Sequence, residues 1–231
     1  MSGSPRLISL NTSVPGTLSW RGHDLRTGIF KQPVAGRRQA GMLGLAGDHV
    51  EDLRVHGGAD KALYAYPSEH YAFWREQYPG LEIGWGAFGE NLTLAGLLED
   101  GVQVGDRFRA GNAELEVSQF RIPCFKLARK LGQPNLVKRF LASGRCGWYL
   151  RVVKEGGLGT GDEWELLSRD PAGSSIAELI ELYRGREFHR MRLAAAAGLQ
   201  ALPAPWREKL TAWLRRKEPA PWNKSEPEER A

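Results

Sequence analysis

Short apolar runs separated by turn-forming residues are the feature of this sequence that most limits its fold. Between residues 17 and 167, Gly, Asp, Asn and Pro repeatedly break such runs, a pattern typical of barrels and sandwiches rather than of alternating strands and helices. The clearest run, Ala113 to Ser118, alternates apolar and polar side chains and follows Gly111-Asn112, which suits a tight hairpin turn. The sequence therefore predicts a mainly β fold for residues 1–168.

Helical patterns are few before residue 168 and dominate after it. Short helices are predicted at residues 67–77, where three aromatic side chains share one face, and at 125–131 and 135–142. Farther along, Ser175 and Glu178 form a capping box that opens the first of three helices, and the other two follow at 187–197 and about 205–216. We therefore predict a small three-helix bundle at 169–217, followed by a disordered tail at 218–231.

The net charge of +5 is unevenly distributed along the chain. Residues 1–168 carry +2, residues 169–217 carry +5 and residues 218–231 carry −2, so the extended basic surface that nucleic-acid binding requires is not predicted. Residues 1–20 contain no apolar stretch long enough for a signal peptide or a membrane span. We therefore expect a cytoplasmic protein that binds neither membranes nor nucleic acid, and whose two cysteines stay free.

A long segment without acidic residues surrounds one of these cysteines. The 38 residues between Glu116 and Glu155 include nine basic side chains, and Cys124 lies among them. Cationic neighbours and a helix beginning after Pro123 both favour the thiolate form of Cys124, a nucleophile or metal ligand. The alternative is a small buried cysteine with basic residues on a solvated helix face, and Cys146 fits such a filler role. The nine basic residues are Arg121, Lys126, Arg129, Lys130, Lys138, Arg139, Arg145, Arg151 and Lys154.

A glycine pair with basic neighbours is a second candidate site. Gly57-Gly58 follows His56, and the lack of side chains lets backbone N–H groups approach an anion, while Arg54 and Lys61 supply positive charge. A hard-metal site in the same region is disfavoured, because the glycine pair would end any helix that carried its ligands and because Asp residues in Gly-rich turns are usually structural. That alternative set comprises Asp48, His49, Asp52, His56 and Asp60.

Six motifs in a fixed order resemble those of the MOSC family, and in particular of its YiiM-like branch. They are TGIFKQP (27–33), GLAGD (44–48), VHGGADKALYAYP (55–67), GAFGENL (86–92), VGD (104–106) and SQFRIPC (118–124). The resemblance covers nearly the whole chain and implies a MOSC β-barrel followed by the three-helix domain. It also implies a molybdenum cofactor of the molybdopterin type, whose metal is held by a pterin dithiolene and one protein cysteine.

The resemblance assigns roles to residues within these motifs. Cys124 matches the metal ligand, and soft sulfur suits such a metal. The pterin carries a phosphate, which a set of basic side chains and glycine amides is expected to hold. His56 is expected to donate to the pterin or to a metal oxo group and to assist proton transfer, while Glu90 and Asn91 orient the pterin ring nitrogens. The expected phosphate-binding set is Lys31, Arg54, Gly57, Gly58, Lys61 and Arg121.

An activity is implied as well. Proteins similar to this one reduce N-hydroxylated compounds, including base analogues such as 6-hydroxylaminopurine, to the corresponding amines, which detoxifies them. Because the sequence holds no flavin or iron–sulfur motif, an external reductase must supply the electrons, and the basic C-terminal helices are a candidate surface for docking an acidic donor. A homodimer is a further expectation. The alternative function is a non-catalytic carrier of the molybdenum cofactor, or of sulfur bound to Cys124.

Overall fold

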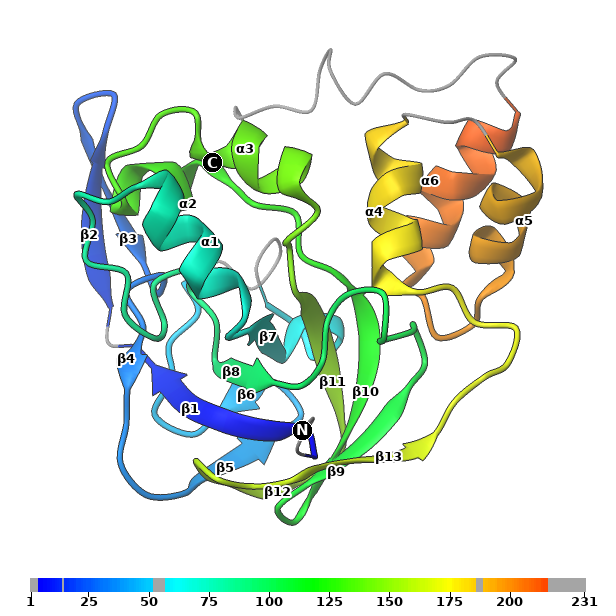
Figure 1. Cartoon of the computed structure of the whole chain (residues 1–231), viewed down its shortest axis with the longest axis horizontal. Coiled ribbons are helices and arrows are strands. Elements are labelled where there is room, and N and C mark those ends of the chain that lie inside the picture. The colour runs from blue at the N-terminus through cyan, green and yellow to red at the C-terminus, as the bar shows by residue number, and fades with distance from the viewer. Residues whose placement is uncertain (1–3, 14, 52–56, 186–188, 216–231) are drawn as a thin grey trace.

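A mixed sheet of eight strands forms the centre of the computed structural model, which describes residues 4–13, 15–51, 57–185 and 189–215. In Figure 1 the C-terminal helices lie at one end of the longest axis, and a separate two-stranded hairpin lies at the other. The predicted tail, residues 218–231, falls outside the described residues. In spatial order the strands are β13 (Trp164–Ser168), β9 (Arg107–Ala110), β10 (Ala113–Phe120), β11 (Trp148–Lys154), β7 (Leu63–Pro67), β8 (Leu92–Ala95), β1 (Arg6–Thr12) and β4 (Gln32–Pro33).

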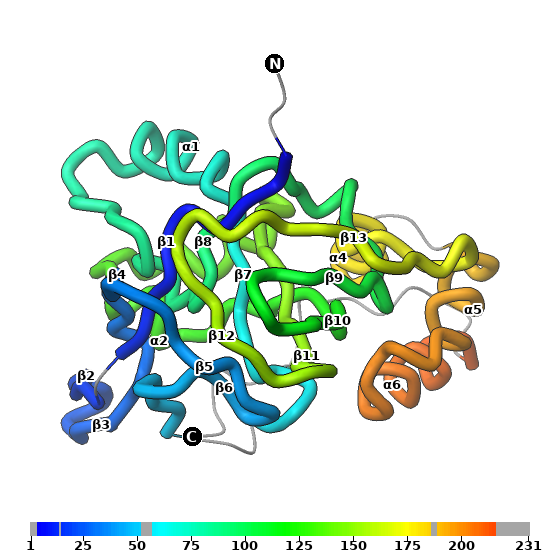
Figure 2. Tube along the Cα trace, turned by 90° about the horizontal axis from the view of Figure 1, so that it is seen from below, coloured from blue at the N-terminus to red at the C-terminus, as the bar shows by residue number. Residues whose placement is uncertain are grey.

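Two smaller sheets and seven helices complete the described residues. One sheet has the order β12 (Gly156–Leu158), β5 (Arg38–Gly41) and β6 (Gly44–Leu45), and the other pairs β2 (Gly16–Trp20) with β3 (His23–Thr27). Figure 2 places α1 and the β5–β6 hairpin on opposite sides of the large sheet. The helices are η1 (Ala59–Lys61), α1 (His70–Gln77), α2 (Phe125–Lys130), α3 (Leu136–Ser143), α4 (Ile176–Arg184), α5 (Arg190–Gly198) and α6 (Ala204–Leu214).

The two sides of the large sheet approach each other without forming a continuous ladder. An isolated bridge joins Arg6 of β1 to Glu163, and the amide of Trp164 donates to the carbonyl of Pro5 over 2.7 Å. The mainly β prediction is confirmed. In the described residues, however, the strand ladders form an open sheet that meets itself at this bridge, and the expected closed barrel is not found.

Strand β10 carries the sequence towards the candidate cysteine. Its first residue, Ala113, pairs with Ala110 of β9, so Gly111-Asn112 forms the predicted two-residue hairpin turn, and Gly111 has the positive φ of 53° that such turns favour. The alternating burial of residues 113–117 confirms the predicted strand. At its other end, Phe120 pairs with Trp148 of β11. The predicted strand thus extends two residues beyond Ser118 and ends four residues before Cys124.

Helix α1 covers one side of the sheet with aromatic side chains. Tyr71 and Trp74 are buried as the spacing predicts, and the Trp74 ring stacks on Phe140 of α3 with centroids 5.1 Å apart. The helix begins at His70 rather than at residue 67, because Pro67 ends β7, where it pairs with Leu94 of β8. Strands β7 and β8 are parallel, and a parallel pair requires a long connection, which here contains α1.

The C-terminal segment forms three helices, as predicted. Ser175 caps α4, accepting a hydrogen bond from the Glu178 amide at 3.1 Å, and the Glu178 carboxylate returns one from the Ser175 amide at 3.0 Å. The helices pack against the end of β10, where the Phe120 ring lies 5.4 Å from Tyr183 of α4 and 5.0 Å from Trp206 of α6. Whether residues 169–217 form an independent bundle, with a domain boundary at residue 168, stays a prediction. Within the described ranges, no helix is both long and apolar enough to cross a bilayer.

Candidate functional site

One cavity brings together five of the ten residues that were predicted to bind the cofactor. Its walls come from the segments that follow β3 and β6, from the start of β7 and from the connection between β10 and α2. These segments are far apart in the sequence, and the fold makes them neighbours. The five predicted residues that line the cavity are Lys31, Lys61, Asn91, Arg121 and Cys124.

The glycine pair lies beside the cavity rather than in its wall. Gly58 has a φ of 87°, a conformation that favours glycine, and its carbonyl accepts from the Lys61 amide over 3.0 Å. This turn brings Lys61 to the cavity. The structure therefore supports a positioning role for Gly58, whereas the expected amide contacts to a phosphate stay a prediction. The predicted roles of Arg54 and His56 also stay predictions, because both residues lie outside the described ranges.

Cys124 opens onto the cavity at the start of α2. It is the N-cap residue, with extended backbone at φ −115° and ψ 168°, and its thiol is free and half-buried. Cys146 is also free, as expected, but it is fully buried near the carbonyl of Phe140, and burial raises the pKa of its thiol. Cys124 is therefore the cysteine that a ligand in the cavity can reach.

Arg121 is a buried cation with no acidic partner among the described residues. Only 5% of it is exposed, and its guanidinium carbon lies 5.2 Å from the Tyr64 ring centroid and 5.4 Å from that of Phe140. Its Nη1 atom has no hydrogen-bond partner. Arginine stays protonated in proteins, and a buried charge without a partner is costly. A guanidinium in this state at a cavity wall suits an anion such as a phosphate.

Tyr149 is a wall residue that the sequence reasoning missed. Its ring lies 5.4 Å from that of Tyr64, and burial raises the pKa of its hydroxyl, although the neighbouring Arg121 opposes this shift. Tyr64 uses its own hydroxyl to donate to the carbonyl of Cys146 over 2.8 Å. The pairing of β10 with β11, which sets Tyr149 opposite Gln119, is the signal that could have placed Tyr149 beside Arg121.

Asp48 binds two residues that line the cavity, Lys31 and Asn91, and we call these three residues the floor. The sequence reasoning missed this role of Asp48. Its carboxylate accepts from Lys31 Nζ at 2.5 and 2.6 Å, from the Ser13 amide at 2.9 Å and from Asn91 Nδ2 at 2.7 Å. Burial lowers the pKa of Lys31, and Asp48 counteracts part of this effect. The expected phosphate contact of Lys31 would therefore begin from an ammonium that Asp48 already balances.

The side chains of the motif residues Glu90 and Asn91 mainly form hydrogen bonds within the protein. Glu90 is fully buried and does not line the cavity; its carboxylate accepts from the amides of Gly86 at 2.8 Å and Phe88 at 3.1 Å, and from the Tyr71 hydroxyl. Burial raises the pKa of Glu90. Asn91 lines the cavity, but its amide group bridges Asp48 and the Tyr64 backbone. The structure thus places Glu90 outside the lining of the cavity, and the roles expected of Glu90 and Asn91 toward the pterin stay predictions.

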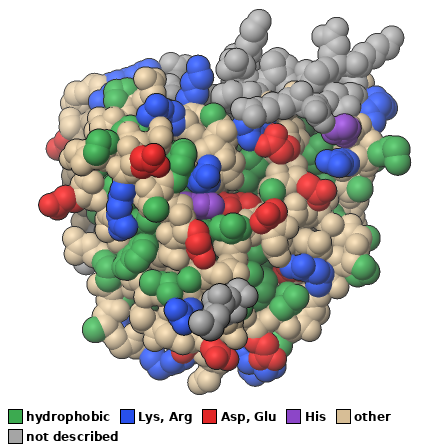
Figure 3. All heavy atoms as spheres, viewed as in Figure 1, with side chains coloured by type: hydrophobic (Ala, Val, Ile, Leu, Met, Phe, Trp, Pro, Cys, Tyr) green, Lys and Arg blue, Asp and Glu red, His purple; other side chains and the backbone are tan. Residues whose placement is uncertain are grey.

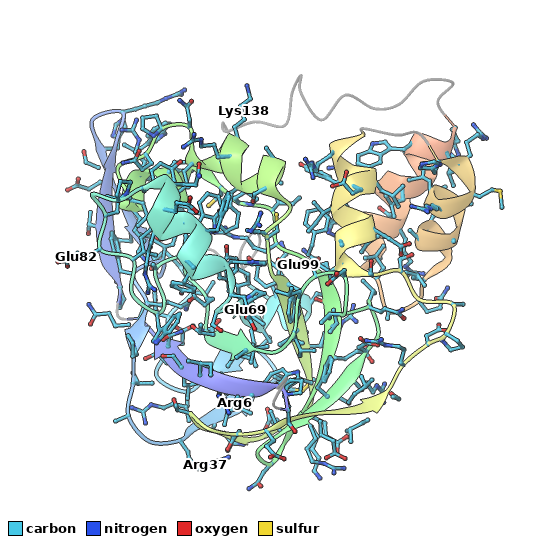
Figure 4. All side chains as sticks on the ribbon, viewed as in Figure 1. Arg6, Arg37, Glu69, Glu82, Glu99 and Lys138 are labelled. Atoms are coloured by element: carbon cyan, nitrogen blue, oxygen red, sulfur yellow. The ribbon has the colours of Figure 1, made fainter. Side chains whose placement is uncertain are left out.

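The basic residues of the acid-free segment have different surroundings in three dimensions. Arg151 is paired, at 2.5 Å with Asp60 and at 2.9 Å with Glu116. Lys130 is mostly buried and donates to two backbone carbonyls, and burial lowers its pKa to about 8. Lys138 points away from α3 into solvent, as Figure 4 shows. Of the nine, only Arg121 and Lys126 line the cavity. The acid-free stretch of sequence therefore suggests more positive charge in the cavity than the structure places there.

The described part of the chain gives no support to the hard-metal alternative. It contains no group of three or more His, Cys, Asp or Glu side chains that could hold a metal ion. Asp48 is committed to Lys31 and Asp60 to Arg151, while Asp52 and His56 lie outside the described residues. On the face shown in Figure 3, acidic and basic side chains are interspersed.

Comparisons with known proteins place these features in a family. The MOSC domain model matches residues 52–165. The uncharacterised protein YflK of Bacillus subtilis is 44% identical over 170 residues, which cover 74% of this chain and 76% of YflK. Protein YiiM of Escherichia coli is 39% identical over 178 residues, which cover 74% of this chain and 78% of YiiM.

A longer relative and a solved structure add to this likeness. A protein of Gibberella moniliformis named a reductase is 33% identical over 181 residues, which cover 77% of this chain but only 32% of that protein. The crystal structure of YiiM from Geobacillus stearothermophilus superimposes with a TM-score of 0.77 at 37% identity, covering 91% of this chain and 99% of that one. The likeness to YiiM therefore extends through both the sheet and the C-terminal helices.

Proposed function

The chain belongs to the MOSC family as a YiiM-like member, and from this premise we propose that it is a molybdenum-cofactor-dependent reductase of N-hydroxylated compounds. The overall reaction converts R–NHOH, two electrons and two protons into R–NH₂ and water. One observation carries the proposal: a reachable cysteine, Cys124, and a buried arginine with an unpartnered nitrogen, Arg121, line the same cavity.

These two residues suit the two ends of a molybdopterin-type cofactor. A cysteine sulfur is a soft donor that binds such a metal, and the free Nη1 of Arg121 matches the phosphate of the pterin. Lys61 and Lys126 line the same cavity and add positive charge near that phosphate. When bound, the cofactor would supply the two electrons that reduce an N–OH group.

The remaining wall residues hold this arrangement in place and limit the entry of water. The Tyr64 ring packs against Arg121 and the Tyr149 ring packs against Tyr64. Low polarity in this part of the wall strengthens the attraction between the guanidinium and an anion. The Asp48 network fixes the floor through Lys31 and Asn91. Proton transfer by His56, and anion binding by Arg54, Gly57 and Gly58, belong to the proposal as sequence-based roles.

Electrons would come from a separate acidic protein in the cytoplasm. The family member named a reductase supports reductive chemistry, and this chain matches only a third of that protein. We propose the C-terminal segment as the docking surface, since residues 169–217, which include α4, α5 and α6, carry a net charge of +5. The proposed function requires neither a membrane nor nucleic acid, and a homodimer is compatible with it.

A turnover assay tests the proposed function. Protein loaded with cofactor would be supplied with 6-hydroxylaminopurine and a reduced dye, and adenine formation would be followed by chromatography. We expect turnover by the wild type and at least a 100-fold lower rate in Cys124→Ala. Cofactor-loaded wild type that forms no more adenine than this variant would overturn the reductase proposal and favour the carrier of cofactor or sulfur.

A further inference from the structure

An open groove lies beside the cofactor cavity and shares part of its wall. It follows the β5–β6 hairpin, and its lining includes Gln39, Leu43 and Leu45. The segment that follows β6 lines both spaces, because His49 and Val50 face the groove as well as the cavity. A molecule in the groove would therefore reach the cavity of Cys124 past the side chain of His49.

His49 forms a pair with a carboxylate at this boundary. Its Nε2 atom lies 2.5 Å from Glu51 Oε2, and the two side chains are 35% and 33% exposed. His49 lines both spaces, whereas Glu51 lines only the cavity. The hydrogen bond with His49 lowers the pKa of Glu51, which therefore stays a carboxylate. A carboxylate at one ring nitrogen fixes the orientation of an imidazole, so Nδ1 of His49 is directed away from Glu51.

Among the residues that the structure describes, few charged groups surround the pair. Arg26 Nε lies 3.7 Å from Oε1 of Glu51, the carboxylate oxygen that His49 does not bind. Lys126 also interacts with Glu51 electrostatically. The nearest carboxylate on the same segment, Asp48, is taken up by Lys31. Among these residues, Glu51 is therefore the one that holds the His49 ring in place.

The backbone that carries His49 is held in place by a close approach. A Cβ atom at Gly28 would lie 1.9 Å from the carbonyl oxygen of His49, so only glycine permits these two segments to pack. Both Gly28 and His49 line the cavity. The position of the His49 side chain is thus set by the packing of its own segment as well as by Glu51.

We propose that the groove binds the planar ring of an N-hydroxylated aromatic amine and that His49, oriented by Glu51, protonates the departing hydroxyl oxygen. This inference rests on the proposed reductase function, and it names the substrate site and the acid for one of the two protons that the reaction consumes, the one that goes to the leaving oxygen. The N–O bond breaks as the cofactor would supply two electrons, which the external donor replaces. The oxygen takes the proton of His49 and leaves as water, the nitrogen takes a second proton from solvent to give the amine, and solvent returns a proton to His49. Leu43, which is 63% exposed at the edge of the groove, gives the ring an apolar contact.

Variants of His49 and Glu51 test the assignment of the acid, and variants of the groove test the binding of the ring. With cofactor-loaded protein, we expect His49→Gln to lower kcat about 100-fold, as the loss of a general acid does, with KM changed less than twofold. The fall of kcat/KM at alkaline pH should disappear in this variant. Glu51→Gln should lower kcat about tenfold. A His49→Gln variant with the kcat and pH profile of the wild type would overturn the assignment of the acid.

Equilibrium dialysis with 6-hydroxylaminopurine measures the groove without turnover. Leu43→Asp should raise the Kd of cofactor-loaded protein about tenfold, whereas Leu98→Asp, at another exposed leucine (40% exposed) that lines neither space, should leave it unchanged. Equal Kd values for Leu43→Asp and the wild type would overturn the groove assignment. A wild type that binds the compound through Leu43 yet does not reduce it would instead contradict the proposed function, so the two failures are distinguishable.

Discussion

The floor and the wall of the cavity each hold a buried cation, but in opposite electrostatic states. On the floor, Lys31 is bound by Asp48, whose other contacts include Ser13 and Asn91. In the wall, Arg121 packs against aromatic rings, has no acidic partner in the described structure and leaves Nη1 unbonded. The positive charge of Lys31 in the floor is thus balanced within the protein, whereas an anion would be needed to balance the positive charge of Arg121 in the wall.

This difference separates residues that build the site from residues that serve a ligand. A buried ion pair that loses one partner strongly destabilises the fold, because the other charge is left without compensation. An unpaired buried charge already carries that cost, so its removal costs the fold little. Substitutions at the two places should therefore affect different properties, and four predictions follow this contrast from the largest effect to the smallest.

Asp48→Asn should destabilise the fold by about 3–5 kcal/mol. The amide keeps the size of the carboxylate but removes the charge that balances Lys31. Urea unfolding of the wild type and the variant gives the difference in free energy of unfolding. The double variant Asp48→Asn, Lys31→Met serves as the control and should recover part of the loss. An Asp48→Asn variant as stable as the wild type would show that the floor is not an ion pair that supports the fold.

Arg121→Met should weaken cofactor binding about 100-fold while the free energy of unfolding stays the same or rises. The methionine keeps apolar contact with Tyr64 and Phe140 but cannot hold an anion. Dissociation of the cofactor is followed by its absorbance, and unfolding by urea is followed by circular dichroism. If the variant lost several kcal/mol of stability and kept its cofactor affinity, Arg121 would belong with the floor.

Lys130 interacts electrostatically with the cations of both regions, Lys31 and Arg121. It should make the free energy of unfolding depend on pH. Burial lowers its pKa to about 8, Glu90 opposes the shift, and the charges of Lys31 and Arg121 add to it. The unfolded chain, with an ordinary lysine pKa near 10.5, binds the proton more readily between these values. The free energy of unfolding should therefore rise from pH 8 to pH 10.5, by roughly 2–3 kcal/mol.

A matched variant isolates this contribution from those of other lysines. Lys130→Met should show a rise that is smaller by that amount over the same pH range. Equal slopes for the wild type and Lys130→Met would mean that Lys130 is not held as a buried cation beside the carbonyls of Ile29 and Gly86.

Substitutions in the C-terminal helices should have the smallest effect on cofactor binding, because these helices contact Phe120, the neighbour of Arg121, rather than Arg121 itself. Trp206 contacts Phe120, the residue before Arg121, at 5.0 Å between ring centroids. Trp206→Ala should weaken cofactor binding about fivefold, and Trp206→Phe should restore most of it. Trp213→Ala is the control, because Trp213 contacts Tyr183 in the same helices but has no ring contact with Phe120. Equal affinities for both alanine variants would contradict this support.

Local patterns in the sequence were sufficient to predict the elements that depend on neighbouring residues. The alternation in β10, the Gly111-Asn112 turn and the capping box of Ser175 and Glu178 are all found in the structure. The parallel pairing of β7 with β8 and the isolated bridge between Arg6 of β1 and Glu163 depend on contacts between distant segments, which local patterns do not record. The sequence therefore predicted a mainly β fold but not how far its sheet closes.

The same limit explains which site residues could be predicted. Cys124 and Arg121 share one motif, so the resemblance located both. Lys31 carries the same formal charge, and its pairing with Asp48, 17 residues away, became visible only in three dimensions. Glu90 is polar in sequence, yet its burial follows from amide and hydroxyl donors that surround its carboxylate. Charge along a chain predicts a site only where folding brings no opposite charge to it.

The most direct test of the central claim is the cofactor content of the purified protein. Wild type, Cys124→Ser and Cys146→Ser would be produced in a host that makes the cofactor, and molybdenum and pterin would be measured per protein chain. Wild type and Cys146→Ser are predicted to contain both in near-equal amounts, and Cys124→Ser to have lost most of its molybdenum. Wild type without molybdenum or pterin, or Cys124→Ser with the molybdenum content of the wild type, would contradict the account.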